Sequence, residues 1–128
     1  MVLIFHIHPR ATEINFSVDG DFEVGFYQEN GAVFIMNEVH KNQAAVFPKG
    51  AIHFEQNLNC HPVTFVAAFN NEDPGVLTIS EAFFGFLPAN VVGAALGGLN
   101  ISTVEDIRLQ LVKNPSIGIA ECRQRCRL

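Results

Sequence analysis

The chain of 128 residues lacks tryptophan, has a single tyrosine and has few charged residues, which make up 16% of the total. The net charge is −5, and no basic stretch is interleaved with aromatic residues, which argues against nucleic acid as a partner. No apolar run reaches the roughly 18 residues that a membrane-spanning helix needs. The opening apolar run, MVLIF, is too short for a secretion signal, so we expect neither a signal peptide nor a membrane partner.

Hydrophobic residues, by contrast, make up 48% of the chain, and twelve residues are phenylalanine. This composition argues against a disordered chain. The length predicts one domain, and the phenylalanine content predicts a core packed with these rings. So apolar a sequence is also consistent with a buried subunit interface.

Cysteine is scarce. Cys60, Cys122 and Cys126 fit neither a zinc motif nor a complete disulfide framework. Cys122 and Cys126 lie four residues apart, and a disulfide within one helical turn would be strained. Each of them can pair with another element or another chain, and Cys60 is a candidate partner for either. Three reduced, buried thiols are the alternative, and the sequence leaves the choice open.

The first 80 residues contain short strand-like segments separated by turn residues. Runs rich in Val, Ile, Phe and Thr alternate with Gly, Pro, Asn and Asp, a pattern typical of an antiparallel sandwich or barrel. A hairpin turn is expected at Glu29-Asn30-Gly31. We expect strands over residues 14–18, 22–27, 32–36, 44–47, 52–56, 63–69 and 76–79.

After residue 80 the pattern changes to helices. We expect one helix over residues 91–96, a second over residues 103–113 and a third within residues 117–128. Ser102 is the expected N-cap of the second helix, with Glu105 completing a capping box.

This change divides the chain into two parts. Residues 1–80 are expected to form a β-barrel that lacks the usual N-terminal strands. Residues 81–128 are expected to form a helical extension, which packs on the barrel or on a neighbouring subunit. We treat the two parts as a single domain overall.

Four residues in the strand region have the character of metal ligands. His6 and His8 stand two apart, so on a strand both side chains point to the same face. Glu13 follows five residues later. Gly50 supports a turn with unusual backbone angles, and this turn would bring His53 in from a separate strand. The sequence therefore predicts a site with three imidazoles and one carboxylate.

The ligand types narrow the choice of metal. Nitrogen and oxygen ligands without thiolate suit Mn(II) or Fe(II), while Zn(II), Ni(II) or Cu(II) can bind on affinity alone. Mn(II) is our prediction, with about two positions of an octahedral shell left open. The other two histidines, His40 and His61, lie in turn-like sequence and are not expected to be ligands.

Two segments resemble the sequence motifs of the cupin superfamily. Residues 6–20, HIHPRATEINFSVDG, resemble its first motif, HxH(x)4E(x)6G. Residues 48–57, PKGAIHFEQN, resemble its second motif, PxG(x)2H(x)3N. The stretches HPRATE, VFPKGAIHFEQN and LPANVV are similar to germin-like cupins, and the final ECRQRC is similar to spherulin-type relatives from fungi and slime moulds.

The resemblance implies a mainly β fold, a cupin-type antiparallel β-barrel (jelly roll) with C-terminal α-helices. It implies manganese bound by His6, His8, Glu13 and His53. It also implies a secreted homo-oligomer, either a dimer, a trimer or a hexamer. The signal peptide, the N-terminal disulfide and the first strands of germin-like proteins are missing here, so we expect an N-terminally truncated product or a shortened barrel.

The resemblance points to redox chemistry on a small anion, of the oxalate oxidase or superoxide dismutase type. Asn15, on the strand that follows Glu13, is a candidate for orienting a bound ligand. Glu72 and Glu81 are candidates for proton transfer.

Two other functions stay open. The first is a non-enzymatic wall, storage or stress protein with a structural metal, as the resemblance to spherulins suggests. The second is a metal-dependent isomerase or dioxygenase that acts on a larger metabolite. A cavity lined by Phe16, Phe54 and Phe65 would favour this last function.

Overall fold

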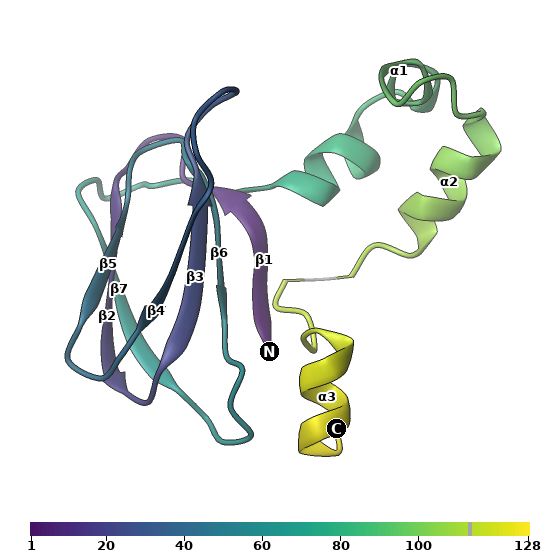
Figure 1. The fold of residues 1–128 in the computed structure, drawn as a ribbon. Coiled ribbons are helices and arrows are strands. Elements are labelled where there is room, and N and C mark those ends of the chain that lie inside the picture. The colour runs from purple at the N-terminus through teal and green to yellow at the C-terminus, as the bar shows by residue number, and fades with distance from the viewer. Residues whose placement is uncertain (113) are drawn as a thin grey trace.

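The structure is a computed structural model that describes residues 1–112 and 114–128. Its first part consists of two antiparallel sheets that face each other (Figure 1). One sheet has five strands in the order β4-β3-β6-β1-β8, and the other has three in the order β5-β2-β7. The strands are β1 (Val2–Ile7), β2 (Glu13–Asp19), β3 (Phe22–Tyr27), β4 (Ile35–Val39), β5 (Ala44–Phe47), β6 (Ile52–Gln56), β7 (Thr64–Phe69) and β8 (Leu77–Thr78).

This arrangement confirms the predicted mainly β, antiparallel fold with C-terminal helices. Within the described residues no strand pairing joins the two sheets, so side-chain packing rather than a continuous ladder holds them together. The core that joins them consists of Phe22, Val24 and Val39 from the larger sheet and Phe47 from β5.

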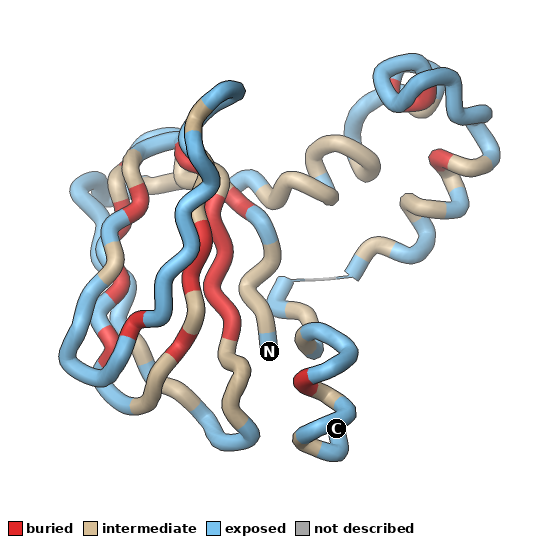
Figure 2. The backbone as a smooth tube through the Cα atoms, viewed as in Figure 1, coloured by how far each residue is buried: buried red, intermediate tan, exposed pale blue. Residues whose placement is uncertain are grey.

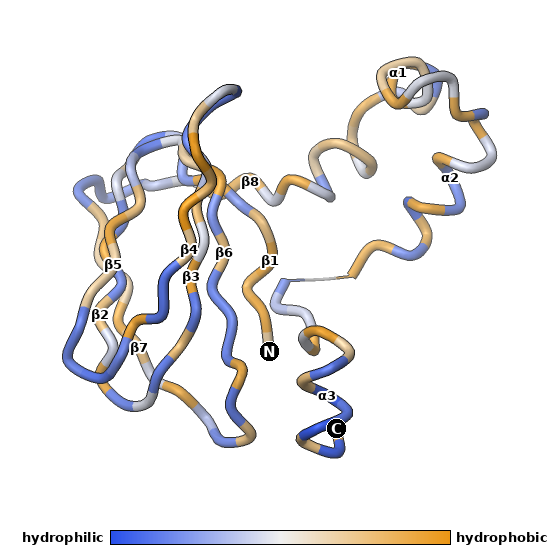
Figure 3. Tube along the Cα trace, viewed as in Figure 1, coloured by the Kyte–Doolittle hydropathy of each residue, from blue (hydrophilic) through white to orange (hydrophobic). Residues whose placement is uncertain are grey.

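Beside this core, the space between the sheets is polar. On β2, Glu13, Asn15 and Ser17 are buried, whereas Ile14 and Phe16 face solvent. Strand β6 is buried along most of its length in Figure 2, yet much of it is hydrophilic in Figure 3. Buried polar groups are costly unless they are paired or bind a ligand, so these two strands mark the place where a site is expected.

Most strand boundaries agree with the prediction, and β3, β5 and β6 match it residue for residue. The strand predicted over residues 32–36 is an exception, because β4 begins at Ile35. Phe26 of β3 pairs with Ile35, which leaves residues 28–34 as the connection. The predicted turn at residues 29–31 lies within this longer loop.

Four helical segments follow the strands. They are a π-helical segment, η1 (Glu81–Phe86), and the α-helices α1 (Ala89–Ala95), α2 (Ile101–Leu109) and α3 (Ala120–Cys126). The three predicted helices are confirmed as elements, and η1 was not predicted. The predicted end of the second helix at Lys113 lies outside the described residues. Figure 1 shows α1 and α2 standing away from the sheets, while α3 lies near the start of β1.

The N-cap of α2 differs from the prediction. Asn100, not Ser102, caps the helix: its side-chain oxygen accepts hydrogen bonds from the Thr103 backbone N–H at 2.8 Å and from the Ser102 hydroxyl at 2.7 Å. Glu105 does not complete a capping box but forms an ion pair with Arg108 at 2.9 Å. Asn100 has the extended backbone that an N-cap needs, and this places the helix start two residues earlier than predicted.

The cysteines resolve into one disulfide and one thiol. Cys60, in the loop between β6 and β7, is bonded to Cys126 at the end of α3. Cys122, one turn earlier on α3, is buried and unpaired. None of the described helices combines the length and the apolar character needed to cross a membrane.

Candidate metal centre

Three strands and one loop position bring the four predicted ligands together. His6 on β1 is the register partner of His53 on β6, so their side chains project from neighbouring strands of the larger sheet. Glu13 is the first residue of β2 on the opposite sheet. The structure corrects one detail, because β1 ends at Ile7 and His8 lies just beyond the strand.

The geometry of the group is compact. One potential ligand atom from each of His6, His8, Glu13 and His53 lies within 4.8 Å of every other. The Oε2 atom of Glu13 is 3.0 Å from the Nε2 atom of His8 and 3.0 Å from the Nε2 atom of His53. His6, Glu13 and His53 are buried, and His8 is half-buried.

Backbone carbonyl groups hold all three imidazole rings in the same way. The Nδ1 atom of His6 bonds to the Ile4 carbonyl oxygen at 2.9 Å, and that of His53 bonds to the Ala51 carbonyl oxygen at 2.9 Å. The Nδ1 atom of His8 bonds to the carbonyl oxygen of Gly75 at 2.5 Å. A carbonyl oxygen can only accept, so each Nδ1 carries the proton. Each neutral ring then presents the lone pair of Nε2 to the centre.

Burial and charge act differently on two of these histidines. Burial, together with a charged His53 nearby, lowers the pKa of His6 to about 4. Burial also opposes charge on His53, but the hydrogen bond to Glu13 and the other favourable contacts outweigh it and raise the pKa of His53. The lowered pKa keeps His6 uncharged at neutral pH, whereas the contact with Glu13 is a main reason why the pKa of His53 is raised.

This donor set fits a divalent transition metal ion. Lone pairs of three Nε2 atoms and of one carboxylate converge on the same small space, where they repel each other unless a positive charge lies among them. One proton shared by Glu13 and His53 satisfies only part of the set. Three imidazole nitrogens and a carboxylate oxygen are ligands that Mn(II), Fe(II), Zn(II), Ni(II) and Cu(II) accept.

Two aromatic rings fix the orientation of the ligands. Phe47 stacks on the ring of His53, with centroids 4.4 Å apart and planes inclined by 14°. Phe69 meets the ring of His8 edge-on, with centroids 4.7 Å apart. Phe47 and Phe69 are also the register partners of Glu13 on either side of β2, so the smaller sheet surrounds the carboxylate with apolar side chains.

Glu55 is a functional candidate that the sequence analysis missed. Its side chain is almost fully buried, and its Oε1 atom lies 4.0 Å from the Nε2 atom of His53. Burial raises the pKa of Glu55 to about 7. Glu55 lies two residues after His53, and the alternation rule that pairs His6 with His8 would have found it.

The predicted ligand-orienting residue, Asn15, is joined to Glu55. The side-chain N–H of Asn15 donates to the Oε1 atom of Glu55 at 2.6 Å, and Asn15 is fully buried. The Oδ1 atom of Asn15 and the Oε2 atom of Glu55 are buried without a hydrogen-bond partner in the described part of the chain. Buried polar atoms are usually hydrogen-bonded, so we expect a water molecule or a ligand hydroxyl group to donate to these two oxygen atoms.

The two other predicted catalytic residues, Glu72 and Glu81, lie away from the four candidate metal ligands. Glu72 is exposed in the turn before β8. Glu81 is exposed at the start of η1, where it lines a separate cavity with Arg108. His40 and His61 are both exposed, and His40 lies 3.3 Å from Asp21 at the surface.

The three phenylalanines whose joint lining of a cavity would favour a larger substrate do not lie on one face. Phe16 faces solvent on the outer side of β2, with 42% of its surface exposed. Phe54 packs against Phe5 and Phe34. Phe65 packs against the core between the two sheets, where it stacks on Phe22. Strand alternation places Phe16 and Phe54 opposite to the buried Asn15 and Glu55.

Comparison with known proteins adds the family context. The family model described as Cupin matches residues 2–98. Spherulin-1A of Physarum polycephalum is 56% identical over 121 residues, which cover 94% of this chain and 49% of the spherulin. Germin-like protein 8-4 of Oryza sativa subsp. japonica is 43% identical over 84 residues, which cover 65% of this chain and 38% of that protein. The chain thus spans about half the length of the spherulin it matches.

Among solved structures, an oxalate oxidase in complex with the substrate analogue glycolate superposes with a TM-score of 0.78. It is 29% identical in sequence, and the match covers 85% of this chain and 56% of the oxidase. An oxalate decarboxylase from Lactobacillus farciminis superposes with a TM-score of 0.73 at 23% identity, over 88% of this chain and 31% of that enzyme, which supports the fold.

Proposed function

The chain belongs to the cupin family, and we propose that it binds one divalent ion, Mn(II) by preference, and acts on a small anion. The ligands would be His6, His8, Glu13 and His53. One observation carries the proposal: four ligand atoms lie within 4.8 Å of one another, and all three rings are held through Nδ1, with the Nε2 atoms of His8 and His53 next to Glu13. Support for a small carboxylate comes from the similarity to an oxalate oxidase in complex with glycolate, and the preference for manganese rests on the ligand types.

The chain's own residues have defined tasks in this proposal. When bound, the ion supplies a positive charge and redox chemistry to a ligand at its open positions. Glu13 neutralises part of that charge, and the buried ring of Phe47 shields His53 from water while Phe69 packs against His8. Asn15 and Glu55 present acceptor oxygens that hold a water molecule or a hydroxyl group beside the centre.

The first experiment measures metal. We expect about one manganese ion per chain after reconstitution, by elemental mass spectrometry, and loss of that ion in His6→Ala and in His53→Ala. His61→Ala is the matched control, because His61 is exposed and outside the group. Bound metal also stabilises the folded state, by about 2.7 kcal/mol at a hundredfold excess over Kd. A wild-type protein that stays metal-free and unstabilised would contradict the proposal.

The second experiment measures the reaction. With manganese-loaded protein and oxalate, we expect hydrogen peroxide and carbon dioxide from the wild type and from His61→Ala, but not from His53→Ala. A parallel assay with superoxide tests the other redox candidate. Metal binding without turnover in either assay would leave the site intact and remove the enzymatic part of the proposal.

A non-enzymatic role is the second candidate, and the 56% identity to spherulins favours it. In that role the metal would be structural and closed to solvent. Water proton relaxation of the manganese-loaded protein separates the two cases, because only an ion with an exchangeable water ligand enhances relaxation strongly. Strong enhancement favours the enzyme, and weak enhancement favours the structural metal.

We also propose an oxidising, extracellular location. The Cys60–Cys126 disulfide supports it, since disulfides persist mainly in oxidising compartments. Detection of the intact disulfide in protein isolated from the culture medium would test this part of the proposal.

A further inference from the structure

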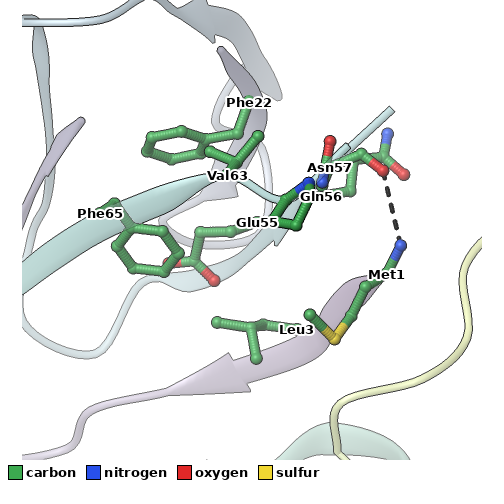
Figure 4. Close-up of a pocket in the computed structure, with 9 residues that line it drawn as sticks. Met1, Leu3, Phe22, Glu55, Gln56, Asn57, Val63 and Phe65 are labelled. Carbon is green, nitrogen blue, oxygen red and sulfur yellow. Dashed lines mark hydrogen bonds between the residues drawn. The ribbon is translucent and has the colours of Figure 1, made fainter. Parts of the chain in front are cut away.

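A cavity of about 160 Å³ lies between the sheets, next to the candidate metal centre. Its walls are largely apolar and come from β1, β3, β6 and β7 together with the loop before β7 (Figure 4). Its apolar lining includes Leu3, Phe22, Val63 and Phe65, and Gln56 and Asn57 lie at its polar side together with Glu55. A cavity of about this size, lined by aliphatic and aromatic side chains, is known to hold a benzene molecule.

One buried carboxyl group interrupts the apolar lining. Figure 4 shows the Glu55 side chain directed toward the ring of Phe65 and the side chain of Leu3. Glu55 is 97% buried, as only 3% of its surface is exposed, and its Oε2 atom has no hydrogen-bond partner in the described residues. Its other oxygen is held by Asn15, so the carboxyl group cannot turn away without losing that bond. An unsatisfied polar atom in an apolar cavity calls for a ligand with a matching polar group.

The chemistry of this carboxyl group selects the ligand. A hydroxyl group can donate to a carboxylate oxygen and can accept from a carboxylic acid, so it matches Glu55 in either form. A second carboxylate can only accept when ionised, and it would repel an ionised Glu55. The size and the walls of the cavity favour a single ring.

We propose that this cavity is a binding site for a small aromatic alcohol, whose ring lies among Leu3, Phe22 and Phe65 and whose hydroxyl group bonds to Glu55. None of the four candidate metal ligands lines this cavity, although Glu55 also borders the metal centre, with its Oε1 atom 4.0 Å from the Nε2 atom of His53. It goes beyond the proposed activity on a small anion and does not require it.

Phenol, toluene and benzoate are suitable probes, because they share a ring and differ in the polar group. NMR titration of the full chain, with and without manganese, measures their affinities. We expect saturable binding of phenol, about tenfold weaker binding of toluene, as the loss of one hydrogen bond to a buried carboxyl group implies, and no binding of benzoate. The same order is expected with and without metal, so this result is independent of the metal experiments.

Two adjacent positions on β1 supply a matched pair of variants. Leu3→Phe fills the cavity, and we expect it to abolish phenol binding. Ile4→Phe makes the same change on a residue that does not line the cavity, and we expect phenol binding to persist. Glu55→Met keeps the length of the side chain and removes its oxygens. We therefore expect phenol and toluene to bind this variant with equal affinity.

Three results would overturn the proposal. They are the absence of saturable phenol binding, equal affinities of phenol and toluene in the wild type, and equal weakening by Leu3→Phe and Ile4→Phe. If Glu55→Met fails to fold, the comparison of Leu3→Phe with Ile4→Phe still tests whether phenol binds in this cavity, because neither of these substitutions removes a polar group.

Discussion

At the scale of single residues, Asn15 and Glu55 are a buried pair in which each side chain has one acceptor without a hydrogen-bond partner among the described residues. In the described part of the chain, the carboxyl group of Glu55 accepts one hydrogen bond, which the side-chain N–H of Asn15 donates. Asn15→Ala would leave both oxygens of a buried carboxyl group without that donor. An unsatisfied buried polar group costs about 1–3 kcal/mol, so we expect the free energy of unfolding in urea to fall by about that amount.

Asn37→Ala is the control for this substitution. Asn37 lies on β4 and is exposed, and exposed substitutions usually change stability by less than about 0.5 kcal/mol. Equal effects of the two substitutions would mean that the Asn15–Glu55 hydrogen bond does not contribute to stability.

The same pair shows what sequence reasoning can find at this scale. The four metal-ligand candidates carry a spacing signal, and the structure brings all four together. The only sequence signal for Glu55 is its position two residues after His53, and an isolated Glu on a strand is usually a surface residue. Its burial depends on which face of β6 turns inward, and that follows from the pairing of β6 with β1 and β3.

At the scale of elements, the start of α2 gives a test with two neighbouring residues. Asn100 accepts hydrogen bonds from the backbone and the hydroxyl group of Thr103 and from the hydroxyl group of Ser102. Replacing an N-cap asparagine by alanine costs about 0.5–2 kcal/mol. We expect Asn100→Ala to speed hydrogen exchange of the first amides of α2, and Ser102→Ala to change it little. Faster exchange in Ser102→Ala than in Asn100→Ala would show instead that Ser102 is the N-cap.

The elements also differ in how well their sequences specify them. Strands β3, β5 and β6 are short runs bounded by turn residues, and their limits were predicted correctly. The run Ala32 to Met36, which overlaps the start of β4, is apolar throughout, so it contains no alternation that sets a register. Pairing with β3 decides where β4 begins, and such long-range pairing is not visible in a local window.

At the scale of the whole molecule, the outer face of the smaller sheet predicts self-association. Ile14 and Phe16 are each 42% exposed, Val46 is 53% exposed and Val66 is 55% exposed. Ile14 pairs with Val46, and Phe16 pairs with Val66, so these side chains form one continuous apolar patch. Such patches on soluble proteins commonly mark protein interfaces, and we expect a homo-oligomer that uses this face.

Phe16→Lys places a charge at the centre of this patch. We expect it to shift the sedimentation coefficient toward that of the monomer, whereas Asn37→Lys adds the same charge to the other sheet and should leave the oligomer intact. A wild type that sediments as a monomer at all concentrations would contradict the prediction.

The disulfide ties the helical extension covalently to the sheets. Cys60 and Cys126 are separated by 66 residues, and their bond ties α3 to the loop between β6 and β7. Around it, Arg125 donates to the carbonyl oxygen of Leu58, and the Cys122 sulfur lies 3.6 Å from the same oxygen. A disulfide that closes a loop of this length stabilises the fold by roughly 2–4 kcal/mol.

Cys60→Ser should therefore lower the free energy of unfolding by that amount and expose the amides of α3 to hydrogen exchange. Manganese content should be retained, because the four ligand candidates come from β1, β2, β6 and the residue after β1, and none comes from α3. Cys122→Ala keeps the disulfide and is the control. If Cys60→Ser loses manganese while Cys122→Ala keeps it, then α3 and the metal centre unfold as one cooperative unit, and the helical extension is part of the site rather than an attachment to it.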